Sequence, residues 1–133
     1  MKKEIAYPEV DEVIEFNQFV LSIVRATKAD SHGVLSIAKI TSSIEECKKT
    51  EGDIYLKAAV LMKSLTGAHA FASGNRRTAF IAAKDFLTRN GGKMAIPDDP
   101  QYAQVLKAIR EGKYSDEEIG EWIKNGRIKQ AER

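Results

Sequence analysis

The stretch from Ile54 to Gly67, IYLKAAVLMKSLTG, is apolar on nearly all sides when it is wound as a helix. This composition is typical of a helix that is buried on most of its faces. A polar segment containing glycine, KKTEGD, separates it from the apolar pattern that comes before. The sequence therefore predicts one central buried helix, against which the rest of the chain packs.

Apolar residues also recur at steps of three and four along most of the remaining chain, which is the spacing of one helix face. This spacing predicts further helices over residues 8–28, 34–44, 75–89, 101–112 and 115–126. Ser115 and Glu118 stand at capping-box spacing. Only KMAI, residues 93–96, looks extended, and no partner strand is visible for it. The expected fold class is all-α, a compact single domain over residues 1–133 with about six helices.

The composition excludes several classes of protein. The chain has 133 residues, 43% of them hydrophobic and 30% charged, which fits one folded soluble domain. The net charge is only +2, whereas a protein that binds nucleic acid usually carries a strong excess of basic residues. No apolar run approaches the roughly 20 residues that cross a bilayer, so no membrane association is expected. The single cysteine, Cys47, favours a reducing, cytoplasmic setting and has no visible activating neighbour.

The segment HAFASGNRRTA, residues 69–79, joins the central helix to the next one. A helix that begins near Asn75 leaves its first backbone N–H groups unpaired, and these groups attract an anion. Gly74 lets the backbone approach a phosphate closely, while Arg76 and Arg77 add cationic donors. The segment therefore predicts a phosphate-binding loop.

His69, at the start of this segment, can accept a proton from a hydroxyl at neutral pH. Two alternatives remain open at this point. His69 could be a buried core histidine with a backbone partner, and Arg76 and Arg77 could be solvated charges at a helix start. Solvated arginines would not stabilise the helix at this place, because cations at a helix N-terminus oppose the helix dipole.

The same segment resembles the signature of the Fic/Doc family: histidine, a spacer, phenylalanine, two further residues, glycine or alanine, asparagine, glycine or lysine, and arginine. His69, Phe71, Gly74, Asn75 and Arg77 match it. The order NRRTA is similar to the form found in the death-on-curing (Doc) branch, in which a cation stands at the position of Arg76. AMP-transferring Fic proteins usually have glycine there, and they carry a second arginine where this chain has Phe80.

The resemblance implies transfer from ATP to a hydroxyl side chain of a target protein. In the Doc branch the transferred group is phosphate and the target is a translation elongation factor; in typical Fic enzymes AMP is transferred. His69 would be the general base. Gly74, Asn75, Arg76 and Arg77 would hold the nucleotide phosphates, and Phe71 would anchor the loop in the core. The resemblance also implies an antitoxin partner, whose disordered segment covers the active-site groove.

Two positions depart from the family pattern. Ser73 stands where the family has an aspartate or glutamate that helps to hold magnesium (Mg²⁺), and a serine hydroxyl is a weak ligand for that ion. No metal ligand is therefore assigned. Arg76 replaces the lysine of the Doc form, and we expect its charge to compensate for the missing metal. Two interpretations follow, an ATP-dependent toxin enzyme or a catalytically degenerate module that binds a nucleotide or partner.

The remaining candidates receive structural interpretations. Asp116, Glu117 and Glu118 are expected to cap a helix rather than bind a metal, because acidic residues favour the first helical turn. His32 is expected on a loop surface, next to Gly33. A DNA-binding helix pair over residues 115–129 is the weakest alternative, because it lacks a basic recognition face.

Overall fold

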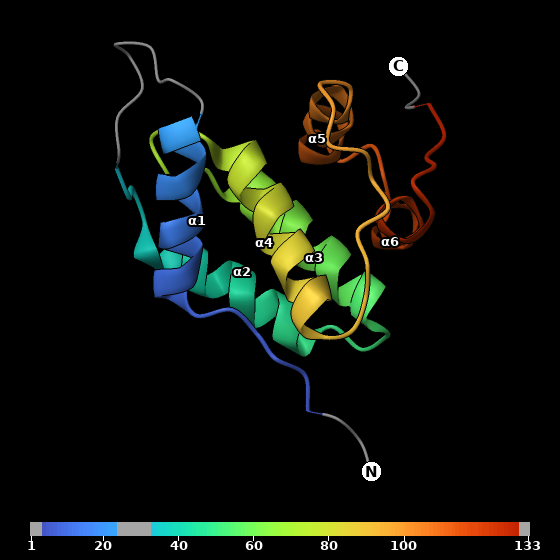
Figure 1. Cartoon of the computed structure of the whole chain (residues 1–133), viewed down its shortest axis with the longest axis horizontal. Coiled ribbons are helices and arrows are strands. Elements are labelled where there is room, and N and C mark those ends of the chain that lie inside the picture. The colour runs from blue at the N-terminus through green and yellow to red at the C-terminus, as the bar shows by residue number, and fades with distance from the viewer. Residues whose placement is uncertain (1–3, 24–32, 131–133) are drawn as a thin grey trace.

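The computed structural model describes residues 4–23 and 33–130. Its helices are α1 (Val10–Ile23), α2 (Ile37–Lys49), α3 (Ile54–Ala68), α4 (Asn75–Arg89), α5 (Tyr102–Arg110) and α6 (Asp116–Asn125). The helices α3 and α4 run side by side in the middle of the molecule, with α1 and α2 on one side and α5 and α6 on the other (Figure 1). The all-α architecture predicted from the sequence is confirmed.

Side-chain caps explain where several helices begin. The side chains of Ser36 before α2 and Asp53 before α3 each accept the backbone N–H three residues on, at 3.1 and 2.9 Å. Ser115 and Glu118 form the predicted capping box at the start of α6. The helix α4 differs, because it follows Gly74 and has no side-chain cap. Its first N–H groups therefore have no partner within the helix.

Small side chains allow α3 and α4 to pack closely. Five alanines of these two helices are fully buried: Ala58, Ala59, Ala79, Ala82 and Ala83. The larger core residues predicted from the sequence are buried as well, namely Met62, Phe80, Phe86 and Trp122. The helix α3 contacts α2, α4, α5 and α6, so the predicted central helix is confirmed.

The structure corrects some predicted boundaries. The second helix begins at Ile37 rather than at residue 34, because residues 33–36 pair with the loop after α3. Residues 93–96 form no strand; Ala95 instead donates its N–H to the carbonyl of Ile123 at 2.8 Å. The predicted end of the first helix at residue 28, and His32, lie outside the described residues. Within the described part of the chain, no helix is long and apolar enough to cross a membrane.

Candidate active site

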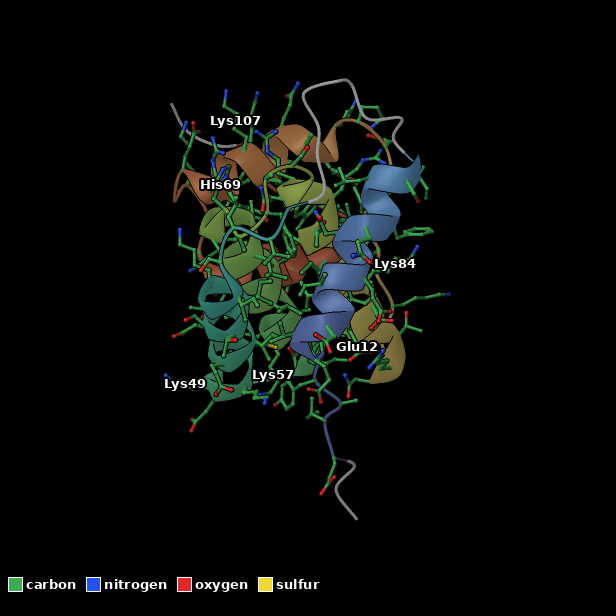
Figure 2. The ribbon with its side chains drawn as sticks, turned by 90° about the vertical axis from the view of Figure 1, so that its left-hand side faces the viewer. Glu12, Lys49, Lys57, His69, Lys84 and Lys107 are labelled. Carbon is green, nitrogen blue, oxygen red and sulfur yellow. The ribbon has the colours of Figure 1, made fainter. Side chains whose placement is uncertain are left out.

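The helix α3 ends in an unusual backbone conformation at His69. This residue has φ 52° and ψ 48°, and it is the one non-glycine residue with positive φ in the described part of the chain. Such a conformation persists only where the surrounding structure holds it, and it is often found at functional sites. The His69 side chain is exposed, at the end of the molecule where Lys107 of α5 also lies (Figure 2). The interpretation of His69 as a buried core histidine is therefore wrong.

Residues 33–36 hold one side of the loop that follows His69. Leu35 donates its N–H to the carbonyl of Ala70 at 2.7 Å, and Ala72 donates to the carbonyl of Gly33 at 2.9 Å. These bonds accompany an isolated antiparallel bridge that includes Phe71. The Phe71 side chain is only 2% exposed and belongs to the core. The loop is thus fixed by a backbone segment far away in sequence.

Asn75 holds the loop from the other end. Its side-chain oxygen accepts the N–H of Phe71 at 3.0 Å, and its side-chain nitrogen donates to the carbonyl of Phe71 at 2.9 Å. Both polar atoms of the Asn75 amide thus bond to the backbone of one loop residue. The structure gives Asn75 a positioning role, and the predicted contact between Asn75 and phosphate stays a prediction.

Asn17 of α1 provides a further anchor, which the sequence interpretation missed. Its side-chain nitrogen donates to the carbonyl of Ser73 at 2.8 Å and to the hydroxyl of Thr78 at 3.1 Å. Asn17 is 2% exposed and shares the buried face of α1 with Val13 and Val20. A polar residue at a position of the apolar helical pattern was the signal that could have identified it.

Gly74 connects this anchored loop to α4. Its φ of 79° lies in the left-handed region that favours glycine, and an added Cβ would come within 3.2 Å of the Asn17 side-chain nitrogen. The first helical bond of α4 runs from the N–H of Thr78 to the carbonyl of Gly74, at 2.9 Å. The N–H groups of residues 75–77 therefore lie at an uncapped helix start, where the helix dipole favours an anion.

The predicted site residues other than Phe71, which lies in the core, surround one cavity of about 580 Å³. From the motif segment, His69, Ser73, Gly74, Asn75, Arg76 and Arg77 line it. The sequence interpretation missed the other walls, which include Thr66 of α3, Asp99 of the α4–α5 connection, and Tyr102 and Arg110 of α5. A neighbouring cavity of about 590 Å³ shares Arg110 but contains none of the predicted site residues.

Tyr102 forms an aromatic wall of this cavity. Its ring stacks on Phe80 with the ring centres 4.5 Å apart. Burial raises the pKa of the Tyr102 phenol, and Asp98 raises it further, although the charge of Arg77 acts in the opposite direction. The phenol therefore stays protonated at neutral pH and can donate a hydrogen bond.

The residues around the cavity do not fit the magnesium site that the family pattern implies. Ser73 offers no carboxylate at the family's acidic position. The one carboxylate lining the cavity belongs to Asp99, and it already accepts the N–H of Gln101 at 2.7 Å. Among the described residues, no group of three or more His, Cys, Asp and Glu side chains could hold a metal ion. We therefore derive no step through a metal.

The site thus combines a histidine at the end of a buried helix with an uncapped helix start beside it. Residues 8–87 match the Fic/DOC family, and this match covers more than half of the chain. The chain belongs to this family. A stretch of 50 residues is also 46% identical to the protein named Toxin Doc from Mycolicibacterium smegmatis. That similarity covers 38% of this chain and 38% of the length of the relative.

Proposed function

We propose that this protein is a Doc-like toxin that transfers the γ-phosphate of ATP to a hydroxyl side chain of a target protein. The observation that carries the proposal is the single cavity lined by His69, the start of α4, and Arg76 and Arg77. The similarity of a 50-residue stretch to Toxin Doc supports the toxin part of the proposal. A translation elongation factor is the target class that the family resemblance suggests.

In the proposed reaction, the His69 imidazole takes the proton from a serine, threonine or tyrosine hydroxyl of the target. The target oxygen attacks the γ-phosphorus, and a new P–O bond forms. The bond from the γ-phosphorus to its bridging oxygen breaks, and ADP leaves with that oxygen. Arg76, Arg77 and the N–H groups at the start of α4 stabilise the negative charge that develops. Gly74 allows the close approach, and Asn75 and Phe71 keep the loop in place.

AMP transfer is the alternative chemistry on the same site. It would require attack on the α-phosphorus and release of pyrophosphate. Phosphate transfer is favoured because Arg76 stands where AMP-transferring Fic proteins usually have glycine. Phe80 also replaces the second arginine of those proteins, and it is buried against Tyr102. That part of the wall is aromatic rather than cationic.

The test uses the purified protein, cell extract from the same source, and ATP labelled at either the α or the γ phosphate. Label on a target protein from γ-labelled ATP alone would support phosphate transfer. Label from α-labelled ATP would overturn it in favour of AMP transfer. No transfer from either donor by folded protein would contradict both activities.

The degenerate binding module is the second candidate, and Ser73 is the residue that favours it. If the protein is such a binding module, ATP binds but no labelled phosphate or AMP is transferred to a target protein. The variant Ser73→Asp would then restore transfer if the missing carboxylate alone explains the loss. Transfer by the wild-type protein would contradict this candidate.

An antitoxin is the partner that we propose for the toxin. A disordered segment of such a protein would cover the groove at the start of α4 and exclude ATP. A short open reading frame next to the gene would identify the candidate. The proposal predicts that the product of that frame binds this protein and suppresses label transfer.

A further inference from the structure

Arg110 in the last turn of α5 lines the same cavity as Arg76 and Arg77 of α4. Three arginines from two helices thus surround one space, together with His69. Between described residues, none of these arginines forms an ion pair with a carboxylate, whereas Arg89 pairs with Glu12 and Asp85. The cavity therefore carries an excess of positive charge in the absence of a ligand.

The single carboxylate of the cavity offsets only part of this charge. Asp99 can neutralise one arginine, and one of its oxygens already accepts a backbone N–H. The family's acidic position, which would add negative charge beside the arginines, holds Ser73. A cavity with this balance favours an occupant with several negative charges, and arginine recognises phosphate through its planar set of donors.

Thr66 is a second, independent feature of the cavity wall, because it places a buried polar side chain there. It is 3% exposed, it lines the cavity, and its hydroxyl has no hydrogen-bond partner among the described residues. Some other helical hydroxyls bond to the carbonyl four residues back, as those of Thr41 and Thr88 do at 3.1 and 3.0 Å. An unpaired buried hydroxyl costs free energy. Because threonine has two accessible rotamers in a helix, rotation of χ1 can present the Thr66 hydroxyl to a ligand.

We propose that Arg110 joins Arg76 and Arg77 in holding the phosphate chain of a nucleoside triphosphate without a divalent metal. This inference rests on the proposed function and extends its binding site to α5. The three guanidinium groups supply the positive charge that a metal ion would otherwise provide. The size of the cavity, about 580 Å³, is within the usual range for sites that bind small molecules.

The alternative explanation for Arg110 is purely structural. A cation in the last turn of a helix is stabilised by the helix dipole, whatever the cavity holds. Lys107 lies in the same last turn of α5, is exposed, and does not line the cavity. Lys107→Ala therefore removes the same favourable dipole interaction without touching the site, and it is the matched control for Arg110→Ala.

The test is a calorimetric titration of the whole protein with ATP, tripolyphosphate and adenosine, in EDTA and in magnesium. We expect ATP and tripolyphosphate to bind the wild-type protein in EDTA. Arg110→Ala should weaken both by about tenfold, because a hydrogen bond to a charged group is lost. Lys107→Ala should leave both affinities within about twofold. Neither variant should change the affinity for adenosine, which carries no phosphate.

The outcomes separate this inference from the proposed function. Equal affinities of Arg110→Ala and Lys107→Ala for ATP would overturn the role of Arg110 and leave the phosphotransfer proposal standing. Binding of ATP only in magnesium would overturn the metal-free site and also leave that proposal standing. Failure of the folded wild-type protein to bind ATP and tripolyphosphate in either buffer would overturn both. Thermal unfolding of each variant checks that the protein is folded.

Discussion

The Asn75 side chain forms hydrogen bonds with both backbone polar groups of Phe71: it accepts the N–H at 3.0 Å and donates to the carbonyl at 2.9 Å. These two bonds join the first residue of α4 to the residue whose side chain anchors the loop in the core. The position of the loop relative to the helix start therefore depends in part on this side-chain amide, beside the bonds from Asn17 and residues 33–36.

Asn75→Ala should lower the free energy of unfolding by about 1–2 kcal/mol, since both hydrogen bonds are lost. It should also weaken ATP binding, because the loop no longer holds its position beside the start of α4. Asn90, at the other end of α4, makes the same two bonds to the backbone of Ala6, at 2.8 and 2.9 Å, and its side-chain nitrogen also donates to the carbonyl of Phe86 at 2.7 Å. Asn90→Ala is the control. Urea denaturation should show comparable destabilisation, while calorimetry should show weaker ATP binding only for Asn75→Ala.

Gly74→Ala should destabilise the protein by more than the left-handed backbone alone requires. An alanine in that conformation costs about 1–2 kcal/mol, and its Cβ would also come within 3.2 Å of the Asn17 side-chain nitrogen. Gly91 has a similar φ of 81° and no atom within 4 Å of an added Cβ. The excess loss of Gly74→Ala over Gly91→Ala in urea denaturation measures the contacts of the added methyl group with α1, of which the one with Asn17 is the shortest. Equal losses would show that the site tolerates the methyl group.

Thr66→Val should leave the free energy of unfolding unchanged or raise it by up to about 1 kcal/mol, because valine removes an unpaired buried hydroxyl. Thr78 is the matched control, since it is 1% exposed and its hydroxyl accepts the Asn17 amide at 3.1 Å. Thr78→Val should cost about 1–2 kcal/mol. Destabilisation of both variants by the same amount, measured in urea, would indicate that the Thr66 hydroxyl has a partner after all.

Cys47 should be unreactive in the folded protein. Burial raises the pKa of its thiol to about 11, although Lys57 and Lys48 act in the opposite direction. Iodoacetamide at pH 8 should therefore modify it slowly, and rapidly once guanidinium unfolds the chain. Because the thiol is harder to ionise in the folded protein than in the unfolded chain, it contributes to the free energy of unfolding. This contribution is complete below about pH 8.5, the ordinary pKa of a thiol, and is lost as the pH rises toward 11. Equal rates of modification with and without denaturant would contradict the burial.

The helices and the motif loop could be predicted from the sequence because their signals are local. The period of the apolar residues, the Ser115 cap and the glycine before α4 each act within a few residues. The residues missed by the sequence interpretation depend on tertiary contacts. Asn17 reaches Ser73 across 56 positions of the chain, and residues 33–36 pair with the loop from another part of the sequence.

Only some of the residues that line the cavity could be predicted from the sequence. The motif segment supplied one wall, because its residues are consecutive and their chemistry is recognisable. Arg110 and Tyr102 looked like ordinary residues of a short amphipathic helix, and only the packing of α5 brings them to the site. The left-handed conformation of His69 also had no sequence signal, since it arises where α3 stops and the paired loop begins.

The most direct test of the central claim compares transfer of γ-labelled phosphate by the wild-type protein and by His69→Ala, with ATP affinity measured for both. We predict that the variant binds ATP normally but transfers at least about a hundredfold less label, because the general base is lost. Transfer at the wild-type rate by a folded His69→Ala protein would contradict the assignment of His69 and of this loop as the active site.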